Sequence, residues 1–356
     1  MKEKSSTLFI ALLVLTVSLA HYEIAFGQAF CALRDPTTRI YELYPQASSY
    51  RSLVQTVDEA ARQHVADKLP FTIHFNELGR HTLYLPVDEQ RPLGLVHARS
   101  ETGAWGLTEI VWSLSPDLTV RNFAFQRCRS RKRTAVETAA FQEQLVGKNF
   151  RQLKQLLNAD GNSLATGKLQ IAEDAQELAV SVVRSALKTI AVTEFAWHRE
   201  LKVIQPLHQI YTSFPKANQI QQINSPYNSQ VLEALNAEFS NGGENKSTSA
   251  IQRSEVKLFR ASGPSNDPDN VDQMSGYVAY VPWKMLQMEI DLWWHLSADG
   301  TVVDVRAQGG WPDQETKNAF ATVKGLSVDK LEQCSSAAQI AGAEIILLVQ
   351  HNSGKR

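Results

Sequence analysis

The sequence predicts an α+β protein of two tandem domains, each an antiparallel sheet with helices packed mainly on one face. Three observations predict this class. The chain has 356 residues, of which 43% are hydrophobic, and this is enough for two complete cores. Two blocks of sequence recur in the same order in its two halves. The longer block has the pattern of two strands around a turn.

The longer block spans 112–126 and aligns with 294–308, with seven of fifteen positions identical. The shorter block spans 40–47 and aligns with 210–217 through a shared Tyr-x-x-aromatic-Pro-x-Ala element. Two matches in the same order indicate a duplication better than one would. The predicted domains span 32–200 and 205–350.

Residue composition assigns the elements within each half. Strand formers on both sides of residues 115–117, and again around Asp299 and Gly300, predict a β-hairpin in each half. Apolar residues at helical spacing, with acidic residues in the first turns, predict a long helix in the first half. The predicted strands are 71–75, 81–85, 93–99, 109–114, 119–125, 256–260 and 276–281, and the predicted helices are 52–67, 135–145 and 172–197.

The N-terminus has the features of a secretory signal. Lys2 and Lys4 precede an apolar run over 8–20 that ends in a small-x-small cleavage pattern. We predict a signal peptide over 1–27 and a periplasmic or other extracytoplasmic location. An uncleaved signal that anchors the chain in a membrane is the alternative, although a spanning helix needs about 20 apolar residues and this run is shorter.

Composition and cysteine content exclude several classes of function. With 36 Lys and Arg against 37 Asp and Glu, the net charge of -1 provides no field for a nucleic-acid backbone, so no nucleic-acid partner is predicted. Cys31, Cys128 and Cys334 form no Cys-x-x-Cys pair, which excludes zinc ribbons and iron–sulfur frameworks. In an oxidising compartment Cys31 and Cys128 can form a disulfide, and buried free thiols are the alternative.

The sequence lacks the common catalytic motifs. It has no His-Glu-x-x-His, Gly-x-Ser-x-Gly or Gly-x-Gly-x-x-Gly. Residues 161–168 have the outline of a phosphate-binding loop, but five residues separate the glycines and Leu169 stands where a magnesium ligand is needed. A nucleotide hydrolase is therefore excluded, and neither a catalytic residue nor a metal site is predicted.

The same stretch contains a second pattern, Asp160-Gly-Asn-Ser163-Leu164-Ala165-Thr166. It resembles the flavinylation motif Asp-x-x-Ser/Thr-Gly-Ala-Thr of the FMN-binding domain family. That family includes the covalent-FMN subunits of the Rnf complex and of the sodium-translocating NADH:quinone reductase. The chain has leucine where the family motif has glycine.

The resemblance covers about residues 40–192, and more weakly the second half, and it implies a cofactor. A flavin transferase would esterify the Thr166 hydroxyl with the phosphate of FMN. Asp160 would help to orient a metal and this hydroxyl, Ala165 would leave space, and Ser163 is the fourth matching residue. The second half lacks the Ala-Thr ending, so we predict a degenerate FMN-binding-like repeat without flavin.

A basic segment follows the first predicted hairpin, and it begins with Arg127 and Arg129. Related domains place a loop close to the flavin at this point. These arginines would then bind the FMN phosphate or stabilise an anionic reduced flavin. A solvated basic loop is the alternative, because runs of charge usually face water.

These features predict an exported flavoprotein module for electron transport that carries FMN on Thr166, a redox carrier rather than a stand-alone enzyme. Its partners would be a flavin transferase for maturation and membrane or periplasmic redox proteins. The alternative is a cofactor-free extracytoplasmic binding or assembly module with a degenerate FMN-binding fold. Leu164 favours this alternative, because a side chain at the glycine position can block modification.

Overall fold

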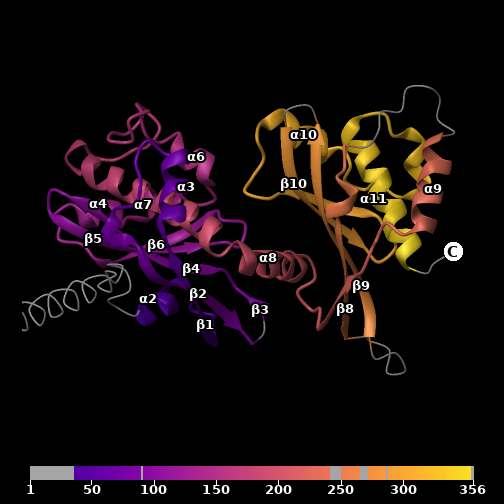
Figure 1. Cartoon of the computed structure of the whole chain (residues 1–356), viewed down its shortest axis with the longest axis horizontal. Coiled ribbons are helices and arrows are strands. Elements are labelled where there is room, and N and C mark those ends of the chain that lie inside the picture. The colour runs from indigo at the N-terminus through magenta and orange to yellow at the C-terminus, as the bar shows by residue number, and fades with distance from the viewer. Residues whose placement is uncertain (1–35, 90, 241–249, 265–271, 286–287, 354–356) are drawn as a thin grey trace, which may run out of the picture. The chain divides into compact units, whose positions relative to one another are not determined.

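The computed structural model in Figure 1 describes residues 36–89, 91–240, 250–264, 272–285 and 288–353. The predicted fold class is confirmed for them: the protein is α+β, with two antiparallel sheets in two tandem domains. The predicted signal peptide and Cys31 lie outside the described residues. Within the described residues, Cys128 and Cys334 are free thiols. No helix of the described chain is long and apolar enough to cross a membrane.

The chain divides into two compact units. All six predicted cofactor-binding residues belong to the first unit. The first unit holds the described residues up to Pro86 with Leu95–Leu114 and Val120–His198, and the second holds Val87–Gly94, Ser115–Thr119 and the described residues from Arg199 onward.

The first sheet, which belongs to the first unit apart from β3 and the end of β2, has the strand order β1-β2-β4-β5-β6, and β3 pairs with β2. Apolar residues at alternating strand positions, such as Ile110 and Trp112, are fully buried because this face is covered by a helix. The strands are β1 (Ser49–Val57), β2 (Gly79–Asp88), β3 (Arg91–Pro92), β4 (Leu95–Gly103), β5 (Gly106–Leu114) and β6 (Val120–Arg127).

The covering helix is α7 (Gln176–Ala196), which packs on β4 and also contacts β1 and β5. Helices α3 and α6 pack against α7 in turn, so α7 is buried over most of its length. The other helical segments of this unit are α2 (Thr37–Leu43), α3 (Glu59–Lys68), η3 (Phe75–Glu77), α4 (Arg133–Val136), α5 (Ala139–Glu143), α6 (Phe150–Lys154) and η4 (Glu173–Ala175).

The sheet of the second unit has the order β11-β10-β9-β8-β7. Its core joins the sheet to α11, with Val281, Trp294 and Ile345 among its buried residues. The strands are β7 (Gln219–Ile223), β8 (Lys257–Pro264), β9 (Asp272–Met285), β10 (Met288–Ser297) and β11 (Val302–Ala307). The helical segments are α8 (His198–Ser213), α9 (Ser229–Ser240), η5 (Arg253–Glu255), α10 (Gln314–Ala321), η6 (Val328–Gln333) and α11 (Ala337–Ser353).

The two predicted hairpins have the same turn. In the first sheet the Ser115 amide donates to the Thr119 carbonyl at 2.9 Å, and in the second the Ser297 amide donates to the Thr301 carbonyl at 3.0 Å. Gly300 has φ 89°, the left-handed conformation that the predicted Asp-Gly turn requires. The strand pattern therefore identified both hairpins correctly.

A second local feature also recurs at the start of the last strand of each sheet. The Gly147 amide donates to the Val120 carbonyl at 2.7 Å, and the Gly325 amide donates to the Val302 carbonyl at 2.8 Å. Both glycines are left-handed, with φ 76° and 78°, where another residue would be strained. These shared contacts support the predicted duplication.

One predicted helix begins later than expected. Residues 52–57 belong to β1, which lies at the edge of its sheet, and the helix starts at Glu59. Asp58 marks the change, because its side chain accepts a hydrogen bond from the Ala61 amide at 3.0 Å and caps the helix. The prediction of a helix over 52–57 is therefore wrong.

Two further assignments are wrong in part. Residues 71–75 form no strand, because His74 and Glu77 make a capping box that starts η3 there. The predicted helix over 135–145 is split into α4 and α5, because the Thr138 side chain caps a new helix. The other predicted strands overlap β2, β4, β5, β6, β8 and β9, and those predicted from 93, 119 and 256 start one or two residues too early. The predicted helix over 172–197 forms η4 and α7.

Candidate functional site

The predicted attachment motif lies on a tight loop, here called the motif loop (residues 157–168), between α6 and η4. Leu157 and Leu164 form an antiparallel bridge across it. The Asn158 amide donates to the Ser163 carbonyl at 3.0 Å, and the Asn158 side-chain amide donates to Ser163 Oγ at 2.8 Å. These bonds fix the turn without help from a ligand.

Thr166 follows this turn, and its side chain is exposed. Backbone contacts hold the chain on both sides of it. The Ala165 amide donates to the Leu156 carbonyl at 2.9 Å, and the Gln170 amide donates to the side chain of Gln144 at 2.7 Å. The hydroxyl is therefore presented to solvent from an anchored segment.

Leu164 occupies the position where the family motif has glycine. Its backbone does not adopt the left-handed conformation that glycine favours, and it forms the bridge with Leu157 instead. The left-handed positions of the loop are Gly161 and Gly167, with φ 67° and 70°. The loop backbone therefore accommodates leucine without strain at this position.

Asp160 and Ser163 both have structural contacts within the loop. Asp160 Oδ1 accepts a hydrogen bond from the Asn162 amide at 3.0 Å, which is the pattern of an Asx turn. Ser163 Oγ accepts from Asn158, as described above. Among the described residues no group of three or more His, Cys, Asp or Glu side chains could hold a metal ion.

The contacts that the structure shows for the basic segment are with residues outside the motif loop. Arg127 ends β6, and its Nη1 is 3.9 Å from the Glu109 carboxylate, whereas Arg129 is exposed. Lys132 forms an ion pair with Asp174 of η4. The structure thus brings the four motif residues together on one loop, and the contact seen for Arg127 is with Glu109 of β5 instead.

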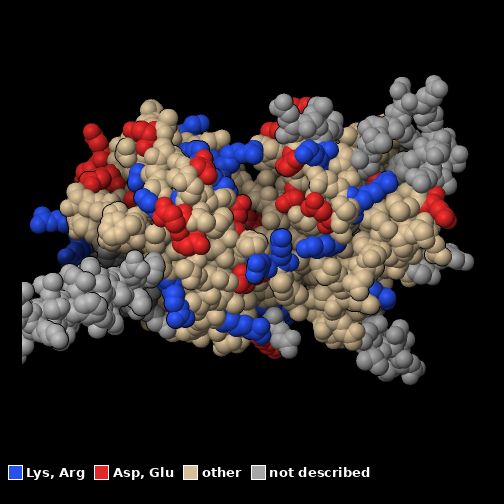
Figure 2. All heavy atoms as spheres, viewed as in Figure 1, with Lys and Arg blue, Asp and Glu red and all other residues tan. Residues whose placement is uncertain are grey.

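Figure 2 shows acidic and basic side chains interspersed over the face of the molecule that it draws. This agrees with the near-neutral net charge of the chain. The first unit also holds charged side chains in its interior, among them Glu77, Arg99 and Lys188.

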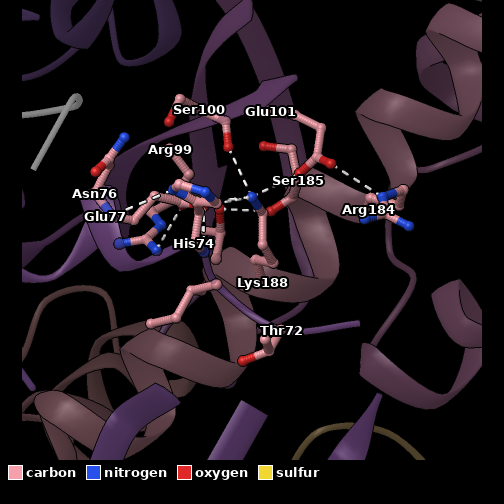
Figure 3. Close-up of polar contacts among 12 residues, drawn as sticks. Thr72, His74, Asn76, Glu77, Arg99, Ser100, Glu101, Arg184, Ser185 and Lys188 are labelled. Atoms are coloured by element: carbon pink, nitrogen blue, oxygen red, sulfur yellow. Dashed lines mark hydrogen bonds and ion pairs between the residues drawn. The ribbon is translucent and has the colours of Figure 1, made fainter. Parts of the chain in front are cut away.

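Arg184 of α7 lies beneath the motif loop. Its Nη1 donates to the Gly161 carbonyl at 3.0 Å and to Asn162 Oδ1 at 3.2 Å, and its Nε donates to Glu101 Oε1 at 3.0 Å. The guanidinium also lies 4.0 Å from the centre of the Phe71 ring. One side chain therefore joins the motif loop to β4, and Figure 3 shows its contact with Glu101.

Glu101 is the first link of a line of buried charges. Lys188 Nζ lies 2.6 Å from Glu101 Oε2 and 3.0 Å from Glu77 Oε1, and it donates to the Ser100 carbonyl at 2.8 Å. Arg99 Nη2 donates to Glu77 Oε2 at 2.9 Å. We call Arg184, Glu101, Lys188, Glu77 and Arg99 the buried charge chain (Figure 3).

Two periodicities place these side chains face to face. His97, Arg99 and Glu101 occupy alternating positions of β4 and therefore share one face of the sheet. Arg184 and Lys188 are four residues apart on α7 and therefore share one side of the helix. The polar row of the strand meets the polar row of the helix in the middle of the domain.

Burial and neighbouring charges set the protonation of this region. Burial alone would raise the pKa of Glu77, but Lys188 and Arg99 outweigh it and hold that pKa below its ordinary value. Burial, with Arg99 nearby, lowers the pKa of His81 to about 3. Burial and the same arginine hold the pKa of His97 well below its ordinary value. Both histidines are therefore neutral at pH 7.

The second unit has apolar residues at the matching positions. His97 is opposite Trp112 in the first sheet, and Ala279 is opposite Trp294 in the second. If Ala279 of β9 corresponds to His97 of β4, the residues two and four positions further along β9 correspond to Arg99 and Glu101, and both are apolar. They are Val281 and Trp283, both buried.

No protein-family model matches the chain, and no curated protein matches it. The case for any function therefore depends on the motif loop and the charges beneath it.

Proposed function

We propose that the first unit is an FMN-carrying electron-transfer module, with the flavin attached to Thr166 through a phosphoester. The observation that carries this proposal is the exposure of Thr166 on an anchored loop that also holds Asp160, Ser163 and Ala165. An acceptor hydroxyl has to be reachable by a separate transferase, and a fixed loop keeps the product in a defined place.

The attachment step is a phosphoryl-type transfer. A bond forms between Thr166 Oγ and the phosphorus of FMN, and the bond between that phosphorus and the leaving group of an activated FMN donor breaks. The hydroxyl proton leaves with the help of the transferase. Once attached, the flavin supplies one- or two-electron transfer, and the protein supplies its position and electrostatic surroundings.

The location, the partners and the second unit fit one scheme. We propose an exported protein that passes electrons between a membrane redox chain and an extracytoplasmic acceptor, where covalent attachment prevents loss of the cofactor by diffusion. The sequence of the second unit lacks the Ala-Thr ending of the motif, and its described residues at the positions of Arg99 and Glu101 are Val281 and Trp283. We therefore propose that it is a duplicated copy without flavin that serves as a packing or docking partner.

The proposal predicts that Thr166→Val abolishes flavin attachment. The full chain is co-expressed with a periplasmic flavin transferase and examined by intact mass and by flavin fluorescence in a denaturing gel. Wild type should gain the mass of FMN less one water, and Thr166→Val should gain nothing. Thr134→Val, which changes another exposed threonine of this unit, should label like wild type. A bare wild-type chain in cells with an active transferase contradicts the proposal.

The cofactor-free alternative rests on Leu164, whose half-buried side chain stands between Ser163 and Ala165 in the motif. Because the loop backbone does not depend on glycine at this position, any effect of the side chain is steric. Leu164→Gly should therefore label several-fold faster than wild type in a time course with the transferase. Label on Leu164→Gly together with a bare wild type would favour the alternative.

A further inference from the structure

We infer that the first unit has a binding site for a phosphate group at Arg184, beneath the motif loop, and that FMN is held there by its phosphate. The identity of the ligand rests on the proposed function. The existence of the phosphate site rests only on the buried charge chain and its contacts.

The charges of this chain do not balance. Three cationic side chains face two carboxylates, and the adjacent His81 and His97 are neutral at pH 7. One positive charge is left over in a region where Arg99, Lys188 and both carboxylates are at least nine-tenths buried. An uncompensated charge in such surroundings is costly, so binding of an anion stabilises it.

Arg184 is the end of this chain that a ligand can reach. Its side chain is 20% exposed, whereas the side chains of Lys188 and Arg99 are 4% and 0% exposed. Its Nε and Nη1 are used by Glu101 and by the motif loop. Among the contacts of the described residues, Nη2 is the donor left to a ligand.

The surroundings hold the Arg184 guanidinium in one place. The Phe71 ring lies on one face of it at 4.0 Å, and the motif loop covers another side. The loop comes this close because Gly161 has no side chain: a Cβ atom there would lie 2.8 Å from the Phe71 ring. A guanidinium fixed in this way binds an anion without losing its own freedom.

Phosphate is the anion that fits the charge of this site, and Thr166 belongs to the same loop as Gly161 and Asn162, which Arg184 contacts. A phosphate esterified to Thr166 and to the flavin side chain keeps one negative charge, which equals the surplus of the buried charge chain. Asp160 lies on the same loop, but its carboxylate is exposed and is used by the Asn162 amide. Arginine prefers phosphate oxygens, to which its planar group donates in pairs.

The test separates phosphate recognition from covalent attachment. The full chain with Thr166→Val, made in a host without a flavin transferase, is titrated with FMN and with riboflavin, which lacks the phosphate, while flavin fluorescence is followed. FMN should bind at least about tenfold more tightly than riboflavin. Inorganic phosphate should compete with FMN, and added salt should weaken FMN binding more than riboflavin binding.

Adding Arg184→Gln should remove the preference for FMN and leave riboflavin binding unchanged. Arg184→Lys, which keeps the charge, should retain part of the preference. This result would show that the loss in the glutamine variant comes from the missing charge and not from a defect in folding. Arg62→Gln is the matched control, because Arg62 also binds a carboxylate and a backbone carbonyl, those of Glu59 and Ile73. It should behave like the parent.

Equal affinity for FMN and riboflavin in the parent, or an unchanged preference in Arg184→Gln, overturns the inference. The outcomes also distinguish it from the proposed function. If phosphate competes with FMN in an Arg184-dependent way but wild type is never flavinylated, the phosphate site is supported and the proposed covalent FMN is contradicted. If flavin is attached to Thr166 but FMN binding does not depend on Arg184, the proposed function is supported and the phosphate site is contradicted.

Discussion

Replacing Lys188 with methionine is expected to lower the free energy of unfolding of the first unit by about 3–5 kcal/mol, the usual cost of breaking a buried ion pair. Lys188 contacts Glu77 and Glu101, and its side chain is 4% exposed. Methionine fills similar space but makes none of the contacts that Lys188 makes with the two buried carboxylates and with the Ser100 carbonyl. The remaining cations of the chain, Arg99 and Arg184, then hold one carboxylate each.

Urea unfolding followed by circular dichroism measures this loss. Lys68→Met is the matched control, because Lys68 also forms an ion pair, with Glu194 at 2.7 Å, but both side chains are partly exposed. Exposed pairs contribute at most about 1 kcal/mol, so this variant should unfold almost like wild type. Similar small losses in both variants would show that the buried charge chain is not important for stability.

Local sequence signals predicted the parts of the fold that depend on local interactions. The Asp299 and Gly300 pair marked a hairpin, and apolar spacing marked α7, because turn geometry and helix periodicity are properties of short segments. Residues 52–57 misled the prediction because edge strand β1 is largely exposed and residue type does not follow exposure along it: Val54 is exposed, whereas Gln55 is half-buried. Only its pairing with β2 makes it a strand.

The candidate site shows the same division between local and distant interactions. The motif loop was identified from consecutive residues, but Arg184, Lys188 and Glu77 were missed. Glu77 and Lys188 are 111 residues apart in the sequence, so their contact depends on how α7 packs on the sheet. One signal was present: alternating His97, Arg99 and Glu101 give an otherwise buried strand a polar face.

Acid should destabilise the first unit through His81. Its Nε2 lies 2.7 Å from the Glu77 carbonyl, and since a carbonyl only accepts, Nε2 carries the proton. Nδ1 is then unprotonated, and it lies 3.4 Å from Arg99 Nη1. Burial disfavours the charged ring, and a second proton on it would also lie against the Arg99 guanidinium. For these two reasons, burial first, the pKa of His81 falls from 6.5 to about 3.

The sign of the pH effect follows from this shift. Below pH 6.5 the unfolded chain binds a proton at His81 that the folded unit refuses until about pH 3, so stability is lost as the pH falls through this window. The slope is about 1.4 kcal/mol per pH unit, or about 2 kcal/mol between pH 6.5 and 5. His97, whose pKa is also lowered, acts in the same direction.

Comparing wild type with His81→Gln isolates this contribution, because glutamine keeps a donor for the Glu77 carbonyl but does not titrate. The free energy of unfolding of wild type should fall more steeply between pH 7 and 5 than that of the variant, by about 2 kcal/mol over the window. His295 of the second unit, with its pKa lowered to about 4 by burial, contributes equally to both proteins and cancels. His198→Gln, which changes an exposed histidine, should follow wild type. Parallel curves for wild type and His81→Gln would mean that this ring accepts its proton in the folded domain.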